Sequence, residues 1–268
     1  MKITDISSCV LGPEISQQEY IPEHYFLYLL KGSMKAFDGI KQYNIQPGDY
    51  CIALKNHLAR YTKYREDNEF EKVIITFDKP FLQNFLIRYP QKPITPSQIN
   101  DSYIFLNDNP LMKSFIISLE PYYLGGQKID KDFADVKREE LLLILLRTVP
   151  ELAGEFFNFG IRGKVDLEQY MNGNFRFNIG LDRFAHFTGR SISAFKRDFE
   201  KTFSTRPALW LKKKRLQEAY FQIDKKKRKP VEIYLEVGFE NLSHFSRSFK
   251  AEFGLSPQEL AKKHYLKY

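Results

Sequence analysis

The spacing of hydrophobic positions follows three successive patterns along this chain of 268 residues. The first pattern consists of short runs rich in aromatic and β-branched residues, separated by turn signals such as Asp38-Gly39 and Gln46-Pro47-Gly48-Asp49. The runs cover residues 25–30, 34–37, 40–45, 50–54, 58–64 and 70–77. Many short strands with regular turns indicate a barrel or a sandwich, so we expect a β-barrel over about residues 1–80.

The second pattern is helical and covers about residues 80–160. It predicts helices over residues 80–88, 111–123, 132–149 and 151–159, with a mostly looped, proline-rich segment at 90–110. Residues 141–146 are apolar on every side of their helix, which predicts burial on more than one face. That helix could lie between its own barrel and a second subunit, or be enclosed within one subunit.

The third pattern is a repeated amphipathic helix near the end of the chain. Its second copy follows a turn at Gly238 and has Asn241 as a helix N-cap and Gly254 as a C-cap. One face carries Leu242, Phe245, Phe249 and Phe253, and the opposite face carries Ser243, Ser246, Arg247 and Lys250. A small helix with one apolar face and one hydrogen-bonding face suits a DNA major groove.

The first copy lies fifty residues earlier. Phe195, Phe199 and Phe203 match the later phenylalanines, and Ser193, Arg197 and Pro207 match Ser243, Arg247 and Pro257. Short helices over residues 181–187 and 231–237 precede the two copies, which predicts two helix-turn-helix units. A helix over residues 208–223, about 24 Å long, would separate them. Recognition helices on one face of B-DNA need a separation of about 34 Å.

These motifs give residues 163–268 a close resemblance to the DNA-binding domain of the AraC family of bacterial transcription regulators. The strongest matches are Glu236-Val-Gly-Phe, Ser243-His-Phe-Ser-Arg-Ser-Phe-Lys and Phe253-Gly-Leu-Ser-Pro. Tyr234 departs from the small residue usual there. The resemblance implies a cupin-like N-terminal barrel, for which Pro47-Gly48-Asp49 is a weak independent match. It also implies an α+β chain with two domains, residues 1–160 for effector sensing and dimerisation and 161–268 for DNA binding.

The resemblance further implies partners. They are double-stranded promoter DNA, RNA polymerase, a small-molecule effector of unknown identity, and a second copy of the chain that binds through the helices of about residues 111–149. The expected DNA contacts are Ser193, Lys196, Arg197, Ser243, His244, Ser246, Arg247 and Lys250. We expect Lys196, Arg197 and Arg247 to contact bases, because Arg binds guanine with two hydrogen bonds. The alternatives are phosphate contacts or, for Arg247, an ion pair within the domain.

The distribution of charge supports the division into two domains. The net charge is +8, yet residues 161–268 hold 23 Lys and Arg against 12 Asp and Glu, whereas residues 1–160 hold 18 against 21. A basic half joined to a mildly acidic half suits a nucleic-acid-binding module. The runs at 212–215 and 225–229 are either solvated faces or phosphate contacts, and Arg215 could be structural. Two cysteines, no secretory signal and no apolar run long enough to cross a bilayer predict a cytoplasmic protein that binds no membrane and is associated with the nucleoid.

Catalytic chemistry has little support in the sequence. Nucleotide-binding glycine motifs, H-E-x-x-H and C-x-x-C are absent, and His24 and His57 are the only histidines before residue 186. We therefore expect no enzyme activity, no metal site and no cofactor, with both histidines at the surface or lining a pocket. Tyr25, Phe26, Tyr28, Tyr43 and Tyr50 could line a ligand pocket, although each is more simply a core residue.

The sequence thus predicts a transcription regulator, most simply an activator, controlled by a small molecule or partner at its N-terminal domain. Two alternatives remain open. The first is a DNA-binding factor without a small-molecule ligand, whose barrel mediates only protein contacts. The second is a metal-dependent cupin enzyme with a basic accessory domain.

Overall fold

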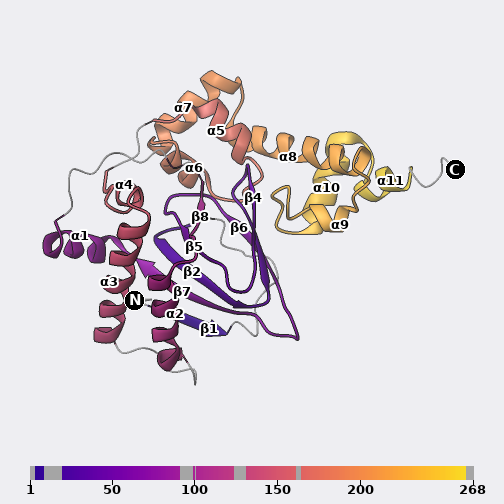
Figure 1. Cartoon of the computed structure of the whole chain (residues 1–268). Helices are drawn as coiled ribbons and strands as arrows, with labels where there is room; N and C mark the ends of the chain where they lie inside the picture. Colours follow the sequence, from indigo (N-terminus) through magenta and orange to yellow (C-terminus); the bar gives the residue numbers. More distant parts are fainter. Residues whose placement is uncertain are drawn as a thin grey trace. The chain divides into compact units, whose positions relative to one another are not determined.

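The structure, a computed structural model, describes residues 4–8, 20–90, 99, 101–123, 131–160 and 164–263. The chain divides into two compact units, Met1–Gly160 and Ile161–Tyr268 (Figure 1). The first unit combines β-sheets with helices and the second is helical, so the predicted two-domain α+β fold is confirmed.

The strands of the N-terminal unit form two antiparallel sheets. A five-stranded sheet has the order β1-β7-β2-β5-β8, and a three-stranded sheet has the order β4-β3-β6. The strands are β1 (Thr4–Ser8), β2 (His24–Lys31), β3 (Ser33–Phe37), β4 (Gln42–Ile45), β5 (Tyr50–Ala53), β6 (Arg60–Tyr64), β7 (Glu71–Phe77) and β8 (Tyr103–Phe105). The six runs of the sequence pattern correspond to β2–β7. Among the described residues the two sheets do not close into the single barrel expected from the sequence.

Strand β8 lies in the segment expected to be mostly loop. Its three residues pair with β5, so that Ile104 is opposite Ile52 at the edge of the five-stranded sheet. A strand this short has too few residues to show a period-two pattern, and it forms because a sheet edge far away in the sequence offers it hydrogen-bond partners.

The described residues of the N-terminal unit form two hydrophobic cores. One lies between the five-stranded sheet and the helices and includes Phe26, Phe77 and Phe115, all fully buried. The other includes Leu27, Met34 and Tyr103 and draws on strands of both sheets. Phe26 and Leu27 are neighbours in β2 that belong to different cores, because successive side chains of a strand point to opposite faces.

The helices of this unit are α1 (Lys79–Arg88), α2 (Pro110–Tyr123), α3 (Lys131–Thr148) and α4 (Leu152–Phe156). Helix α4 is shorter than the predicted 151–159, since the chain leaves the helix after Phe156. In the apolar run of α3, Leu141, Leu142, Ile144 and Leu145 are buried in the core, while Leu143 is 41% exposed. The run is therefore enclosed on most of its circumference by its own subunit.

The C-terminal unit consists of α5 (Leu167–Asn174), α6 (Leu181–Phe187), α7 (Ile192–Phe203), α8 (Pro207–Asp224), α9 (Pro230–Ile233), α10 (Leu242–Phe253) and α11 (Pro257–Lys262). Helix α8 has 18 residues, a length of about 27 Å. Helix α9 ends at Ile233 instead of the predicted 237, and the chain continues in turns in which the Val237 amide still donates to the Ile233 carbonyl. No helix in the described ranges is long and apolar enough to cross a membrane.

Candidate DNA-binding surface

Helix α10 is held at both ends by local chemistry. At its start the Asn241 side chain accepts a hydrogen bond of 2.7 Å from the His244 amide. At its end Gly254 adopts a left-handed φ of 77°, and its amide donates to the Lys250 carbonyl. Phe245 and Phe249 are fully buried against α8 and its neighbours. The buried face fixes which side chains of α10 point outward.

Helix α7 repeats this construction. Ser191 caps it by accepting from the Ala194 amide, and Phe195 and Phe199 are fully buried. Its C-cap is Ser204, which holds φ at 52° in the left-handed region where the second copy has glycine. The predicted N-caps Ser191 and Asn241 are therefore both present.

The side chains expected to contact DNA lie on the outward faces of these two helices. Of the eight, only Ser246 is half-buried, and the other seven are exposed: Ser193, Lys196, Arg197, Ser243, His244, Arg247 and Lys250. Arg247 makes no ion pair with any residue that the structure describes. An exposed guanidinium without an internal carboxylate is available for a base or a phosphate.

Arg197 differs from Arg247 because a carboxylate lies beside it. Its Nη2 is 3.2 Å from Asp198 Oδ1, although 76% of the Arg197 side chain remains exposed. Asp198 also accepts from Arg190 Nε at 3.2 Å, and these two arginines, Arg190 first, lower the pKa of its carboxyl. Arg190 in turn donates to the carbonyls of Val165 and Thr188, so it stabilises the turn before α7.

A connector of four residues, 175–178, ties the two helix-turn-helix units together. Arg215 of α8 donates to the Phe175 carbonyl at 2.8 Å and to the Phe177 carbonyl at 2.6 Å. Arg176 pairs with Glu218 at 2.8 Å, and Asn178 donates to Glu240 beside α10. Arg215 thus has the structural role that the sequence analysis considered for it.

The connector and Arg215 approach the backbone closely at Gly238. Its φ is 93°, and a Cβ there would lie 2.7 Å from both the Arg176 carbonyl oxygen and Arg215 Nε. The turn before α10 therefore needs a glycine both for its conformation and for the approach of the connector. Sequence spacing marks the turn but not the connector, because the hydrogen bonds of the connector join residues 38 to 62 positions apart.

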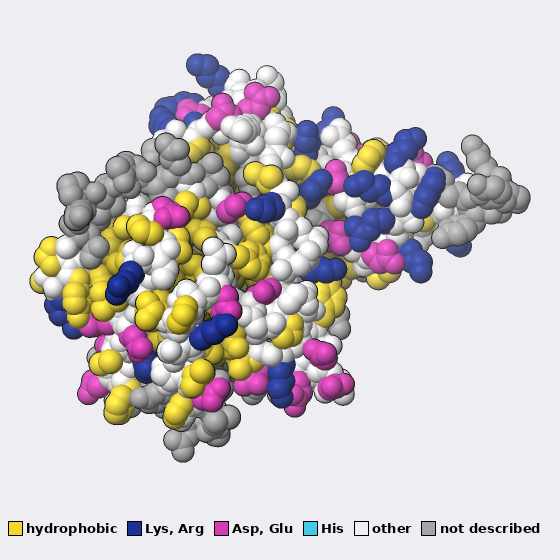
Figure 2. Space-filling model, in the orientation of Figure 1, with side chains coloured by type: hydrophobic (Ala, Val, Ile, Leu, Met, Phe, Trp, Pro, Cys, Tyr) yellow, Lys and Arg dark blue, Asp and Glu magenta, His cyan; other side chains and the backbone are white. Residues whose placement is uncertain are grey.

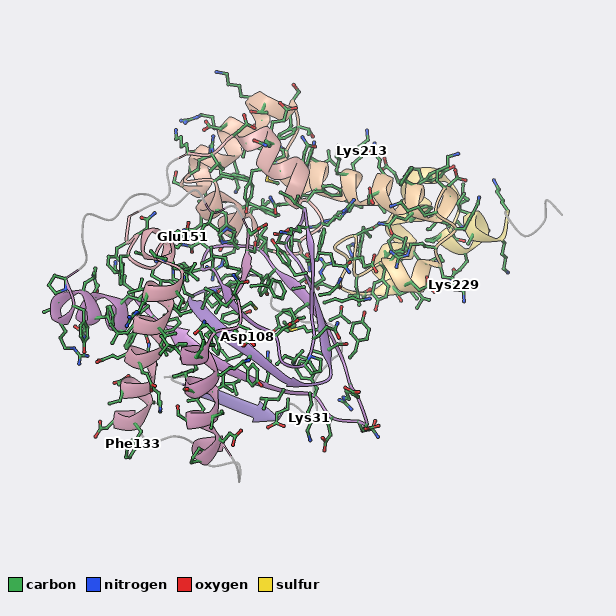
Figure 3. The ribbon with its side chains drawn as sticks, viewed as in Figure 1. Lys31, Asp108, Phe133, Glu151, Lys213 and Lys229 are labelled. Carbon is green, nitrogen blue, oxygen red and sulfur yellow. The ribbon has the colours of Figure 1, made fainter. Side chains whose placement is uncertain are left out.

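Both basic runs expose lysines, and each contains an arginine that bonds within the unit. Lys212 and Lys213 are exposed, and Lys213 is labelled on α8 in Figure 3. In the other run Arg228 donates to Glu236 at 2.9 Å, which explains the glutamate of the Glu236-Val-Gly-Phe motif. Lys and Arg side chains gather over α8–α11 in the view of Figure 2.

The N-terminal unit has a different surface. Its α3 helix presents a stripe at alternating spacings of three and four residues, which we call the α3 stripe: Phe133, Val136, Glu140, Leu143 and Arg147. Glu140 is half-buried and the other four residues are exposed. Phe133 and Val136 are 56% and 62% exposed. Figure 2 shows hydrophobic side chains gathered over this part of the unit. Such a spacing is that of helices that pair along a seam.

The sequence predicted that both histidines of this unit lie at the surface or line a pocket, and for His24 the prediction of a surface position is wrong. His24 is fully buried, its Nδ1 accepts from the Lys55 amide at 3.2 Å, and its ring meets Phe156 edge-on. It is buried because it begins a central strand. His57 is half-buried, so part of its side chain reaches the surface. In the part of the chain that the structure describes, no three His, Cys, Asp or Glu side chains gather as metal ligands.

A cavity of about 480 Å³ lies between α2 and the five-stranded sheet, with Tyr28 and Tyr50 in its lining. Of the five aromatics considered from sequence, these two line this cavity, whereas Phe26 and Tyr43 are core residues. Tyr25 packs against the core between the sheets.

The fold and both surfaces can be compared with known proteins. Residues 24–154 match the family described as the ExsA N-terminal regulatory domain, and residues 184–263 match a helix-turn-helix domain family. A Haemophilus influenzae protein described as an HTH-type transcriptional regulator is 32% identical over 248 residues, 83% of this chain and 80% of its own. The chain belongs to the AraC family of transcription regulators.

Other known proteins are similar to this chain over most of its length. The thermoregulatory protein LcrF of Yersinia pestis is 29% identical over 239 residues, 86% of each chain. The regulator ExsA of Pseudomonas aeruginosa is 22% identical over 263 residues, 94% of this chain and 91% of its own. A crystal structure of ToxT from Vibrio cholerae aligns over 97% of this chain and 96% of its own, with 12% identity and a TM-score of 0.46. This AraC-family chain is therefore a DNA-binding transcription regulator.

Proposed function

We propose that this AraC-family protein activates transcription by binding two successive major-groove segments of a promoter through α7 and α10. The observation that carries the proposal is the repetition of one exposed polar and basic face on two capped helices of a single compact unit. Base contacts are assigned to Lys196, Arg197 and Arg247, and the remaining predicted residues, Ser193, Ser243, His244, Ser246 and Lys250, contact bases or phosphates.

Activation rather than repression is inferred from relatives. The Yersinia enterocolitica relative, 23% identical over 239 residues, is described as a virulence regulon transcriptional activator. An activator of this kind would contact RNA polymerase from the promoter, which makes the polymerase a proposed partner.

A homodimer is proposed through the α3 stripe and the neighbouring outward face of α2. On α2, Leu111 and Ile117 are 45% and 63% exposed. Apolar side chains in this number at one surface favour a partner, and the heptad-like spacing in α3 favours a second copy of the same helix. Two copies would bring four recognition helices to one promoter.

Control by the N-terminal domain is proposed in the form of a small-molecule effector. The cavity beside α2 supports control by a small molecule. An N-terminal domain without a pocket would instead favour control by a protein partner. Ligand binding next to α2 would shift the population of domain arrangements that bind DNA.

Selection of bound DNA from a random pool, at low and at moderate salt, tests the DNA-binding proposal. We expect a motif with two half-elements about one helical turn apart, which is the spacing that two recognition helices on one face require. Recovery of no motif, with binding that disappears steeply as salt rises, would show that phosphate attraction dominates and would overturn sequence recognition by α7 and α10.

Arg197→Ala then tests base contact on the recovered site. We expect a loss of about 1–3 kcal/mol of binding free energy on the specific site and little change on scrambled DNA. Lys213→Ala is the control for a basic residue of α8 outside both recognition helices, and it should weaken binding to both DNAs alike. Equal weakening of both DNAs by Arg197→Ala would make Arg197 a phosphate contact.

A further inference from the structure

The cavity between α2 and the five-stranded sheet has walls of unusual composition. Three aromatic rings line it, those of Tyr28, Tyr50 and Phe105, together with Ile116 and Ile117 of α2. The Tyr28 and Tyr50 rings lie 6.2 Å apart with a tilt of 48°, and Phe105 is 43% exposed. A cavity of about 480 Å³ with aromatic walls is of the size and character that hold small organic ligands.

Charges at its rim decide which kind of ligand fits. Asp49, Asp108 and Glu120 line the cavity, and among the residues that the structure describes Lys113 is the only basic one in the lining. Lys113 and the Tyr50 hydroxyl, in that order, lower the pKa of the Asp108 carboxyl, so this carboxyl is ionised at neutral pH. Burial and the hydrogen bond to Asp108 raise the pKa of Tyr50 to about 12, so its hydroxyl stays neutral. The lining therefore has two more negative than positive charges.

Aromatic faces beside carboxylates form a recognisable environment for one ligand class. An ammonium group is attracted both to the faces of aromatic rings and to carboxylate oxygens, while an apolar body packs on the rings and the isoleucines. A carboxylate ligand would instead meet a net negative lining, and a neutral ligand would gain nothing from the charges.

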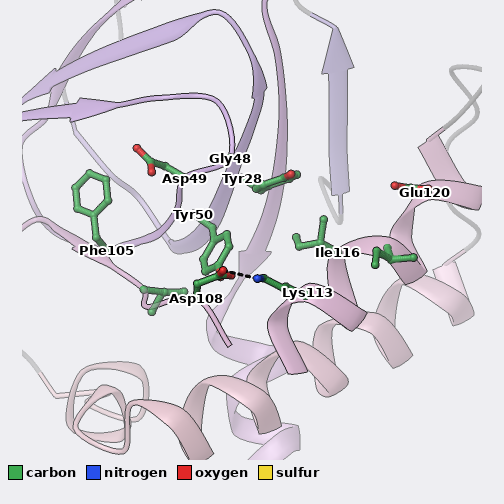
Figure 4. A pocket seen from close by; sticks show the side chains of 11 residues that line it. Tyr28, Gly48, Asp49, Tyr50, Phe105, Asp108, Lys113, Ile116 and Glu120 are labelled. Carbon is green, nitrogen blue, oxygen red and sulfur yellow. Dashed lines mark hydrogen bonds and ion pairs between the residues drawn. The ribbon is translucent and has the colours of Figure 1, made fainter. Parts of the chain in front are cut away.

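The protein already places one ammonium group in this environment. Lys113 Nζ lies 2.6 Å from Asp108 Oδ2, and Tyr50 donates to Asp108 Oδ1 at 2.6 Å (Figure 4). The Lys113 side chain is 63% exposed, so it can leave Asp108 without disturbing the core. Lys113 thus marks where a ligand ammonium would bind and competes with it for the same carboxylate.

We propose that this cavity binds a small organic amine, whose ammonium group replaces Lys113 at Asp108 and whose apolar body lies between Tyr28, Tyr50 and Ile116. The inference rests on the proposed function in that it names a class of effector for the N-terminal domain. Ligand binding would act on helix α2, because Lys113, Ile117 and Glu120 of that helix line the cavity and are also exposed to solvent.

Calorimetric titration of the purified full-length protein with three matched probes tests the proposal. The probes are 2-phenylethylamine, 2-phenylethanol and 3-phenylpropionate, which share a phenyl group on a short chain and differ in charge. We expect the amine to bind at least tenfold more tightly than the alcohol, and the carboxylate to bind more weakly than both. An amine that binds no more tightly than the alcohol overturns the proposal.

Variants separate the cavity from other acidic surfaces. Asp108→Asn, which keeps an acceptor for Tyr50, should weaken amine binding at least fivefold, and Lys113→Met should strengthen it because the competing ammonium is removed. Asp67→Asn, in the turn between β6 and β7 outside the lining, is the charge-matched control and should leave the affinity unchanged. Equal effects of Asp108→Asn and Asp67→Asn would overturn the assignment of the site.

Binding to the selected DNA is measured on the same preparations without amine. Sequence-specific DNA binding without amine binding would overturn this inference alone. Amine binding without sequence-specific DNA binding would overturn the proposed function and leave the cavity assignment standing.

Discussion

At the scale of single residues, the two helix-turn-helix units differ at one C-cap. Ser204 ends α7 with φ at 52°, and Gly254 ends α10 with φ at 77°. Serine in the left-handed region brings its Cβ close to the following carbonyl oxygen, and glycine has no such conflict. The first helix-turn-helix unit therefore has a local backbone strain at Ser204 that the second helix-turn-helix unit avoids.

Ser204→Gly should raise the free energy of unfolding by about 1 kcal/mol, since the conformational strain disappears. Gly254→Ser is the reciprocal control and should lower it by a similar amount. A Cβ at Gly254 would have no heavy atom within 4 Å, so its cost comes from the backbone alone. Chemical denaturation measures both variants. A stability change of the same sign in the two variants would contradict the strain at Ser204.

Residues that act on near neighbours were predictable from sequence, whereas those that act at a distance were not. The caps Ser191 and Asn241 bond to amides three residues away, so their pattern is visible in the chain. Arg215 bonds to carbonyls 38 and 40 residues away, and nothing near it in the sequence indicates that choice. His24 was expected at the surface or in the lining of a pocket, yet its place at the start of β2 buries it.

At the scale of elements, the α3 stripe is the feature that needs a partner. Phe133, at the end of α3 labelled in Figure 3, Val136 and Leu143 share one side of the helix, while Leu142 and Leu145 on the other side are fully buried. The stripe and the core side are thus independent surfaces of one helix. A charge can be placed on the first without touching the second.

Leu143→Glu should weaken self-association of the protein at least tenfold, because each copy would lose an apolar contact of the stripe and add a carboxylate to a seam that already contains Glu140. Ile87→Glu, at a position of α1 that is 78% exposed and lies outside the stripe, is the matched control and should have no effect. Sedimentation velocity over a concentration series measures both variants. Dimers that persist in Leu143→Glu would show that another surface holds the copies together.

The length and hydrophobic periodicity of an element decided whether it could be predicted from the sequence. Strands β2–β7 have four to eight residues with aromatic or β-branched runs, which is enough for a pattern. Strand β8 has three residues, and its pairing with β5 decides its conformation. The repeat of α7 in α10 predicted the candidate DNA-binding surface, whereas the cavity depends on the packing of α2 against the sheet, which no local pattern specifies.

At the scale of the whole DNA-binding unit, function depends on the relative orientation of two recognition helices. Helix α8 packs against both α7 and α10, and Arg215 fixes the 175–178 connector to α8 by two backbone carbonyls. The connector also reaches Glu240, two residues before α10, through Asn178. The first helix-turn-helix unit is therefore held to the second helix-turn-helix unit by these hydrogen bonds as well as by helix α8.

Arg215→Met keeps the aliphatic part of the side chain and removes the guanidinium's hydrogen bonds to the carbonyls of Phe175 and Phe177. We expect the free energy of unfolding to fall by about 1–3 kcal/mol, since two carbonyls lose their donor. Affinity for a site with both half-elements should fall more than affinity for a single half-element, because only the former requires a fixed orientation. Gln217→Met, at an exposed position of α8, is the control and should change neither. Fluorescence anisotropy with the two DNAs measures the affinities, and an equal loss on both would mean that Arg215 supports folding without setting the orientation of α7 relative to α10.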